Sequence, residues 1–442
     1  MPRPRRPLCT DLPRGAMYSD LFLLATALSA AFAVAALRLG LPAALASVAS
    51  MLLFLAPGGG SLGTMPYVGD VAVAVDYYKA PFIAVSVMLG LLVAIYSPRY
   101  LLHLQAPSWY YGVHALYVLS FVYVILFENL IFVFLALELS IITSFLLIWY
   151  FGYGNRRFVA LLYFIWAQAG SILFLIGVAM SGAFLADVFK ASGLASTLVL
   201  IGLLVKMGTA GVHFWLPYAH AEAPTPLSAL LSPVHVGLMA YWIWRLKTGA
   251  GWPLDLLFLY GLATAVYGSL LVFREVDFKR ALADSTIANM GLLVAAASIS
   301  RLEVSYAATA LLFVGHAFAK AALFMLAGLY IVSLHTRIIG EARWDRYLLA
   351  VGVLGFVALA GLFGITLVGK AYVAAGVPHL PHVVALAVLA LVSTAVYSFY
   401  LFNQMYKAGE GRFEYPAEMY AAILAAAAAP YVLLLVLPLW LL

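Results

Sequence analysis

Cysteine and charge are scarce in this sequence. Cys9 is the single cysteine, which excludes a disulfide framework and a cysteine-rich metal site. Charged residues make up 10% of the 442 residues, whereas a soluble domain carries about 25%. Hydrophobic side chains make up 66%, so a solvated, disordered chain is excluded as well. The composition is that of a membrane protein with many spans.

The sequence also lacks a polar stretch long enough to fold as a separate domain. We therefore expect no cofactor in this chain, neither nucleotide, flavin nor iron–sulfur cluster. The formal net charge of +6 comes mostly from Lys and Arg in short loops between apolar runs. That distribution is typical of membrane topology and not of a nucleic-acid surface, so no nucleic-acid partner is expected.

Apolar runs of about 20 residues recur along the whole chain and are bounded by Pro, Gly and charged turns. They predict an all-α polytopic bundle of about 14 helices, with short loops between them. The predicted spans cover residues 20–39, 41–57, 79–97, 111–128, 129–150, 158–181, 194–214, 226–247, 253–273, 281–300, 303–334, 347–374, 381–405 and 417–441.

An even number of spans places both termini on one side of the membrane. Loops on the opposite side carry more Lys and Arg, 12 against 5, which favours termini on the outer face. The arginines at positions 3, 5, 6 and 14 indicate the reverse orientation. No small-residue cleavage site follows a short apolar stretch, so we expect no cleaved signal peptide, and a start at Met17 stays open.

Four ionisable side chains fall near the middle of predicted spans: Glu138, Lys206, Lys320 and Lys370. Placing one such side chain in the middle of a membrane span costs about 3 kcal/mol or more, so each of them needs a structural or functional explanation. Static ion pairs, or lysines that reach the membrane surface, would be structural reasons. A carboxylate beside a buried lysine is otherwise a proton switch, because nearby charge changes the lysine's proton affinity. His316 precedes Lys320 by four residues on the same helix face, which suits either a proton relay or an interhelical hydrogen bond.

The segment from 206 to 241 combines a buried lysine with an interrupted helix. Pro217, Pro224, Pro226 and Pro233 are expected to break it, and freed carbonyl groups are tolerated where they line a hydrated cavity. Broken helices of this kind are typical of ion-coupled transporters. Four further polar residues are candidates for the path, or else loop and interface residues: His213, His220, Glu222 and His235.

Other kinds of site fit this segment poorly. Histidines seven residues apart across a proline match no usual zinc spacing, and the haem-attachment motif Cys-x-x-Cys-His is absent. The glycine run at 58–60 falls in a predicted loop and lacks the strand–turn–helix context of a phosphate loop. We therefore expect no metal site.

The stretch KMGTAGVHFWLPYAHAEAPTPLSALLS, which begins at Lys206, resembles the signature of a membrane family. Its members are the antiporter-like subunits of respiratory complex I (subunits L, M and N of NADH-quinone oxidoreductase), membrane-bound hydrogenases and multisubunit Na⁺/H⁺ antiporters. Similar motifs are ALELS around Glu138, FKRALADSTIANMGLL at 278–293, GHAFAKAALFMLAG at 315–328 and VGK ending at Lys370. Together they cover roughly residues 70 to 375.

The resemblance implies fourteen core helices, with two inverted five-helix repeats that each contain broken helices. We accordingly divide the chain into a tail with the first three helices (1–110), a first half-channel repeat (111–247), a second half-channel repeat (253–405) and a last helix (406–442). The chain resembles the shorter members of the family, which lack the long lateral helix of the distal complex I subunit.

The resemblance also implies roles for the buried charges. Glu138 and Lys206 would form the modulating pair of the first half-channel, His316 and Lys320 would belong to the second, and Lys370 would lie near the exit.

Two positions depart from the family pattern. Gly237 stands where a connecting lysine is usual, and His235, two residues earlier, points about 200° away, so it needs a local rearrangement to replace that lysine. Leu362 and Phe363 stand where a proline pair is usual. Either the glycines at 361 and 364 break this helix, or it is less interrupted.

We therefore expect a proton-translocating, antiporter-like subunit of a redox-driven, complex I-like quinone oxidoreductase or related hydrogenase, in the cytoplasmic (inner) membrane. Expected partners are the lipid bilayer, sister antiporter-like and other membrane subunits, and peripheral redox subunits that hold quinone, flavin and iron–sulfur clusters. The alternatives are a subunit of a cation/proton antiporter without redox chemistry and a structural subunit needed only for assembly. The expected proton path is Glu138, Lys206, His235, His316, Lys320 and Lys370.

Overall fold

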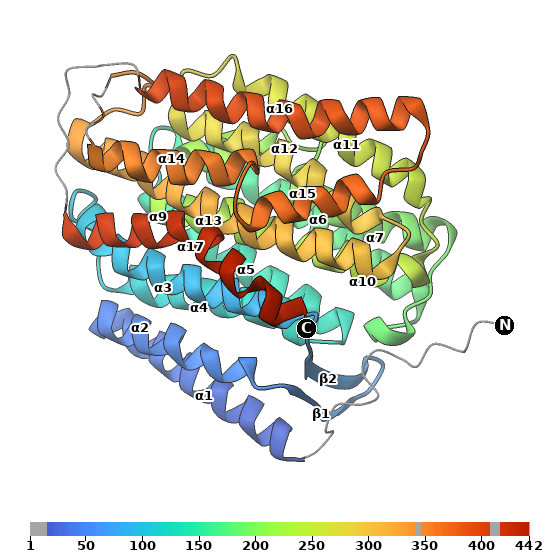
Figure 1. Cartoon of the computed structure of the whole chain (residues 1–442). Coiled ribbons are helices and arrows are strands. Elements are labelled where there is room, and N and C mark those ends of the chain that lie inside the picture. The colour runs from blue at the N-terminus through green and yellow to red at the C-terminus, as the bar shows by residue number, and fades with distance from the viewer. Residues whose placement is uncertain (1–15, 342–343, 345, 407–415, 442) are drawn as a thin grey trace.

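The structure is a computed structural model that describes residues 16–341, 344, 346–406 and 416–441. Helices make up most of it (Figure 1), because a helix satisfies its own backbone hydrogen bonds within one segment, as lipid requires. The first half contains α1 (Ala16–Leu39), α2 (Leu41–Ser50), η1 (Met51–Leu55), α3 (Ala80–Leu102), α4 (Trp109–Leu126), α5 (Leu130–Phe151), α6 (Arg156–Ser181), η2 (Ala186–Val188), α7 (Gly193–Met207), α8 (Trp215–Glu222), α9 (Thr225–Leu230), η3 (Leu231–His235) and α10 (Met239–Ala250). The second half contains α11 (Leu254–Val272), α12 (Phe278–Ser298), α13 (Leu302–Leu334), α14 (Arg346–Ala360), α15 (Ile365–Ala375), α16 (Pro381–Tyr406) and α17 (Ala417–Leu441).

The described residues include 12 helical segments that are long and apolar enough to cross a membrane. This confirms the all-α polytopic class. The other two predicted spans, 41–57 and 194–214, coincide with the shorter apolar helices Leu41–Leu55 and Gly193–Met207. The number of fourteen crossings, the inverted repeats and the four-part division of the chain stay predictions.

The first predicted break lies earlier in the chain than expected. α7 ends at Met207, Gly208 adopts a left-handed conformation with φ 63°, and α8 begins only at Trp215. Pro217 does not break a helix, since it lies in the first turn of α8, where a missing N–H costs nothing. Trp215 donates from Nε1 to the Val205 carbonyl at 3.3 Å, which satisfies one group that the break leaves free.

The later prolines do mark interruptions. Pro224 precedes α9 and Pro226 lies in its first turn. Pro233 lies in η3, a turn of π-helix. One wide turn therefore separates α9 from α10, and it rotates the side chains that follow.

The second break is present despite the missing prolines. Gly361 and Gly364 have φ of 64° and 80°, between the end of α14 and the start of α15. Few residues other than glycine adopt these angles without strain. Leu362 and Phe363 lie between them and are exposed on the outside of the bundle. The glycines therefore provide the break, which settles the alternative left open by the sequence.

A β-hairpin forms where the sequence predicted a loop. β1 (Gly58–Met65) pairs antiparallel with β2 (Gly69–Val75), and the hairpin lies beside α1 (Figure 1). A Cβ at Gly60 would lie 2.4 Å from the Ser19 hydroxyl oxygen, so the strand packs closely on α1. The glycine run therefore serves close packing of a strand against a helix.

α13 is the central helix. It packs against α3, α9, α12, α14, α15 and α17, and almost every residue from Val304 to Ile331 is buried. A helix that is apolar and buried all round belongs in the middle of a bundle. The predicted site residues His316 and Lys320 are carried by this helix, so they lie deep in the protein.

Candidate functional site

Glu138 and Lys206 lie close to each other in the first half of the bundle. Lys206 is 2% exposed at the end of α7, and its side chain packs on Gly170 of α6, where a Cβ would lie 3.0 Å from Lys206 Cγ. Glu138 of α5 is near enough to act electrostatically on Lys206. Lys206 Nζ and Glu138 Oε1 both lack a hydrogen-bond partner within the described part of the protein. The two groups thus form a charge pair without a locked contact.

His235 is held near Lys206 by the π-helical turn. Its Nδ1 lies 3.1 Å from the Tyr117 hydroxyl, and Lys206 acts on it electrostatically. His235 is the last residue of this turn, and its replacement of a connecting lysine stays a prediction. Gly237 has no room for a longer side chain, because a Cβ there would lie 2.3 Å from the Pro233 carbonyl oxygen and 3.1 Å from the Phe313 ring of α13.

His220 lies between the two halves. It is fully buried in α8, and its ring is 5.6 Å from that of Phe324 of α13. Neither ring nitrogen has a hydrogen-bond partner among the described residues. His235 and Lys320 both act on it electrostatically. This residue, a secondary candidate from the sequence, connects the two groups of buried charges.

Lys320 and His316 share one face of α13. Lys320 Nζ donates to the Ser285 hydroxyl at 2.5 Å and to the Leu282 carbonyl, both on α12. His316 lies one turn before it and is electrostatically coupled to it, with both ring nitrogens unpartnered in the described structure. No carboxylate of the described chain forms an ion pair with Lys320.

Lys370 is the last buried lysine and is fixed by the second break. Its Nζ donates to the Ala360 carbonyl, which the end of α14 leaves free, and to the Thr394 hydroxyl of α16 at 2.7 Å. The side chain packs over Gly361, whose Cβ would lie 2.5 Å from Lys370 Cε. The interruption thus supplies both an acceptor and the space for the lysine.

Hydroxyl and amide groups of α12 and α16 join Lys320 to Lys370. Ser285, which accepts from Lys320, is hydrogen-bonded to the Tyr397 hydroxyl, which also accepts from Asn289 Nδ2 at 2.8 Å. The Tyr397 hydroxyl also forms a hydrogen bond with the Ser398 side chain. The Ser398 hydroxyl in turn donates to the Thr394 carbonyl at 2.8 Å. The sequence analysis missed this connection. The small polar residues spaced three or four apart in the span 381–405 were the signal that would have shown it.

We call this buried series the polar axis. It runs from α5 through α7, η3, α8 and α13 to α15. Electrostatic interactions join Glu138 to Lys206, Lys206 to His235, His235 to His220, and both His220 and His316 to Lys320. The hydroxyl and amide groups of α12 and α16 extend from Lys320 toward Lys370. Its members are Glu138, Lys206, His235, His220, His316, Lys320 and Lys370.

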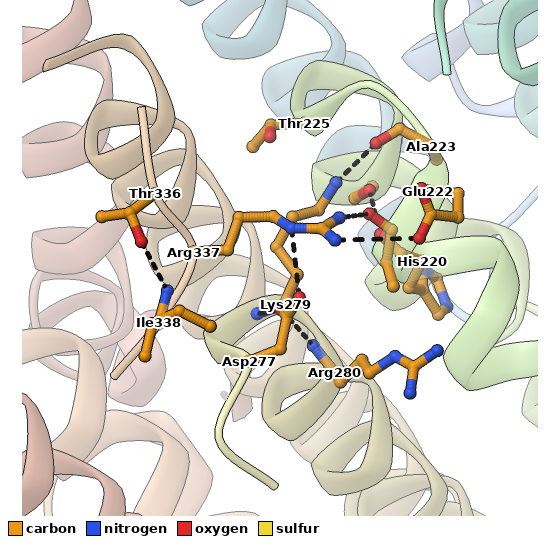
Figure 2. A network of polar contacts seen from close by, with 12 residues as sticks. His220, Glu222, Ala223, Thr225, Asp277, Lys279, Arg280, Thr336, Arg337 and Ile338 are labelled. Atoms are coloured by element: carbon orange, nitrogen blue, oxygen red, sulfur yellow. Dashed lines mark hydrogen bonds and ion pairs between the residues drawn. The ribbon is translucent and has the colours of Figure 1, made fainter. Parts of the chain in front are cut away.

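Glu222 belongs to a different network at a helix end (Figure 2). Arg337, which follows α13, lies 3.7 Å from Glu222 Oε1 and 3.1 Å from Asp277 Oδ2, and it donates to the Ala221 carbonyl at 2.6 Å. Lys279 donates to the Ala223 carbonyl beside it. The network ties the end of α8 to the start of α12 and the end of α13.

A second helix-end network lies near the β-hairpin and was also missed. Lys79, the first residue of the predicted span 79–97, is buried and lies 2.6 Å from Glu128 Oε1. Arg245 lies 3.3 Å from Glu128 Oε2 and also contacts Asp187. Burial raises the pKa of Asp76, which accepts from the Lys79 backbone at 2.9 Å, while the Lys79 charge opposes that shift.

His213 lies apart from the polar axis and lines a cavity. Its Nε2 is 3.1 Å from the Tyr267 hydroxyl of α11. Within the described ranges no three His, Cys, Asp or Glu side chains gather as metal ligands.

The chain belongs to the NADH:quinone oxidoreductase/Mrp antiporter transmembrane family, whose model matches residues 128–398. It is 30% identical over 323 residues to NAD(P)H-quinone oxidoreductase chain 4 2 of Microcystis aeruginosa, which covers 66% of this chain and 57% of that protein. It is 26% identical over 372 residues to F(420)H(2) dehydrogenase subunit M of Methanosarcina mazei, with 76% and 74% covered. A chain in the structure of respiratory complex I from Thermus thermophilus has the same fold, with a TM-score of 0.83, 21% identity, and 95% and 96% covered. The chain thus spans somewhat over half the length of the Microcystis relative.

Proposed function

We propose that this chain is a proton-translocating, antiporter-like membrane subunit of a redox-driven complex related to quinone oxidoreductases. The observation that carries the proposal is the polar axis, a series of titratable side chains inside an apolar bundle, of which all but the half-buried Glu138 are buried. Such groups are costly in a membrane unless they move ions or protons. Family membership and relatives among quinone and F(420)H(2) oxidoreductases support it.

The axis would work by switching charge in the Glu138–Lys206 pair. A negative carboxylate favours the protonated form of a neighbouring lysine, so a change of charge at Glu138 changes the affinity of Lys206 for its proton. Neither group is locked in a direct contact within the described residues, which leaves each free to respond. A proton released from Lys206 has His235 and then His220 as its next titratable neighbours toward Lys320.

Electron transfer would belong to partner subunits. Peripheral redox subunits would hold the flavin, the iron–sulfur clusters and the quinone site, and sister antiporter-like subunits would lie beside this chain in the cytoplasmic membrane. The bias of loop charges favours both termini on the outer face. Purification in mild detergent followed by mass spectrometry tests the partner set: redox subunits support the proposal, and an assembly of small membrane subunits alone contradicts it.

The direct test uses Glu138→Gln and Lys206→Met in the assembled complex, with Lys190→Met in an exposed loop as the control. We expect proton pumping to fall by about a hundredfold in both axis variants, the low end of what a positioned proton-transfer group contributes. The control should pump normally. Normal pumping by both axis variants would leave only a structural subunit.

A cation/proton antiporter subunit is the second candidate, because the family includes Mrp antiporters. The same vesicles distinguish the two functions. Transport that requires an electron donor supports the redox-driven subunit, whereas transport driven by an imposed Na⁺ or K⁺ gradient alone supports the antiporter.

A further inference from the structure

Asp284 is a buried carboxylate in α12 that the polar axis does not include. The residue is 0% exposed, and neither carboxylate oxygen has a hydrogen-bond partner in the described chain. Leaving such a group without a partner is costly, because its interaction with water is lost and nothing replaces it. Asp284 therefore calls for a functional explanation.

The carboxylate lines a cavity of about 290 Å³ between α8, α11 and the start of α12. His213, Tyr218 and Tyr267 form part of its wall, and Arg274 stands at its rim with a side chain that is 69% exposed. The cavity therefore reaches the surface of the protein. Its size and polar lining suit several water molecules, each of which would find hydrogen-bond partners there.

On its other side Asp284 adjoins the polar axis. The Lys320 ammonium donates to Leu282 and Ser285, which are two residues before and one residue after Asp284 on α12. Asp284 and Lys320 interact electrostatically. One turn of α12 thus carries a carboxylate toward the cavity and the acceptors of a path lysine toward the core.

The charges around Asp284 favour protons over metal cations. Arg280 on α12 and Arg274 after α11 are positive, Glu275 is paired with Arg274 at 3.7 Å, and Lys320 faces the group from α13. Sodium or calcium would need several oxygen ligands, and two arginines at the rim oppose a further cation. A proton carried by water needs a single acceptor.

The order of helices places Asp284 as the counterpart of Glu138. α5 carries Glu138 and is followed by α6 and the interrupted pair α7–α8. α12 carries Asp284 and is followed by α13 and the interrupted pair α14–α15. Each half thus has an acid, half-buried at Glu138 and fully buried at Asp284, on the second helix before its broken helix.

We propose that Asp284 is the proton-uptake residue of the second half. Its carboxylate takes a proton from a hydronium ion in the cavity, which breaks one O–H bond of that ion, leaves a neutral water and forms a carboxyl O–H bond. It then gives that proton to the neutral amine of Lys320, which becomes an ammonium while the carboxylate is restored. This rests on the proposed function, since it supplies protons to a lysine of that path.

The test compares Asp284→Asn, which keeps the shape, with Asp284→Glu, which keeps the acid, in vesicles that contain the assembled complex. Asp255→Asn at the exposed start of α11 is the matched control, and Glu138→Gln is measured in parallel. We expect Asp284→Asn to slow pumping by about tenfold, less than loss of an axis residue, because water still reaches the site. The loss should deepen with rising pH, because uptake then depends directly on the proton concentration. Asp284→Glu should restore most of the rate, and Asp255→Asn should pump normally.

Normal pumping by Asp284→Asn while Glu138→Gln is inactive would overturn this inference and leave the proposed function standing. Normal pumping by both would remove the proposed function itself. A loss in Asp284→Asn that is the same at every pH, and that Asp284→Glu does not restore, would show a structural role and also overturn the inference.

Water access gives an independent readout. Asp284→Cys in a Cys9→Ser background should react with a membrane-impermeant maleimide from one side of the membrane. Protection from both sides, in a complex that assembles normally, would contradict a cavity that reaches the surface.

Discussion

The polar axis and the two helix-end networks bury the same kinds of side chain but treat them differently. In the networks, Arg337 has two carboxylates within 4 Å, and Lys79 and Arg245 share Glu128. In the axis, no described carboxylate forms an ion pair with Lys206, Lys320 or Lys370. The lysines meet neutral acceptors or none.

The difference indicates two uses of a buried charge. A close ion pair fixes the protonation state of both partners and holds helix ends together. A lysine that contacts only hydroxyl and carbonyl groups has hydrogen-bond acceptors for its protonated form. When it loses the proton, no carboxylate is left without its counterion. Lys79, Arg245 and Arg337 of the networks have a counterion in contact, whereas Lys206, Lys320 and Lys370 of the axis have none among the described residues.

The largest effect is expected from Lys320→Met. This substitution removes a charge of the polar axis and keeps a side chain of similar volume. Proton pumping should fall by about a hundredfold, because proton transfer between the halves loses its acceptor. Thermal stability of the complex should hold or rise, because a buried charge without a counterion is replaced by an apolar group. Pumping in vesicles and the midpoint of thermal unfolding measure the two effects separately.

The comparison fails if Lys320→Met unfolds the complex at a much lower temperature while pumping per assembled complex is unchanged. Lys320 would then stabilise the fold in the way a network residue does. Lys190→Met, which removes the same charge from an exposed loop, serves as the control.

Lys79→Met should have the opposite profile. It leaves the buried Glu128 with Arg245 as its remaining cation, which the exposed Asp187 also contacts, and an uncompensated buried charge costs about 3 kcal/mol. We expect a lower midpoint of thermal unfolding and normal pumping by the complexes that remain folded. The double variant Lys79→Met/Glu128→Gln should recover much of the lost stability. If it is no more stable than Lys79→Met alone, the Lys79–Glu128 ion pair is not what stabilises this helix-end network.

The fold was largely predictable, because its signals are local. Apolar runs predicted the spans, whereas the sequence left the second break open, and the positive φ angles of Gly361 and Gly364 show it. The errors concern packing. Pro217 breaks no helix because it happens to fall in a first turn, and the glycine run at 58–60 forms a strand because a partner strand and α1 lie beside it.

The site was predictable in its residues but not in its connections. The buried lysines and Glu138 are visible as charges inside apolar runs. Which buried charges have counterions depends on helices far apart in the sequence, so neither the contact of Lys79 with Glu128 nor that of Tyr397 with Ser285 was predicted. Asp284 lies in a polar stretch of α12, where a single carboxylate does not stand out, and only the cavity and its missing partners distinguish it.

His220→Gln is the finest test of the comparison, because it changes only the ability to titrate. Glutamine keeps a polar group beside Phe324 but carries no proton from His235 toward Lys320, so pumping should fall by about tenfold, with water providing a slower connection. Stability should hardly change, since neither ring nitrogen has a hydrogen-bond partner to lose among the described residues. His379→Gln, at an exposed histidine, is the matched control. Unchanged pumping would mean that the two halves are joined by another route, and the polar axis would then be two separate paths that meet only at the surface.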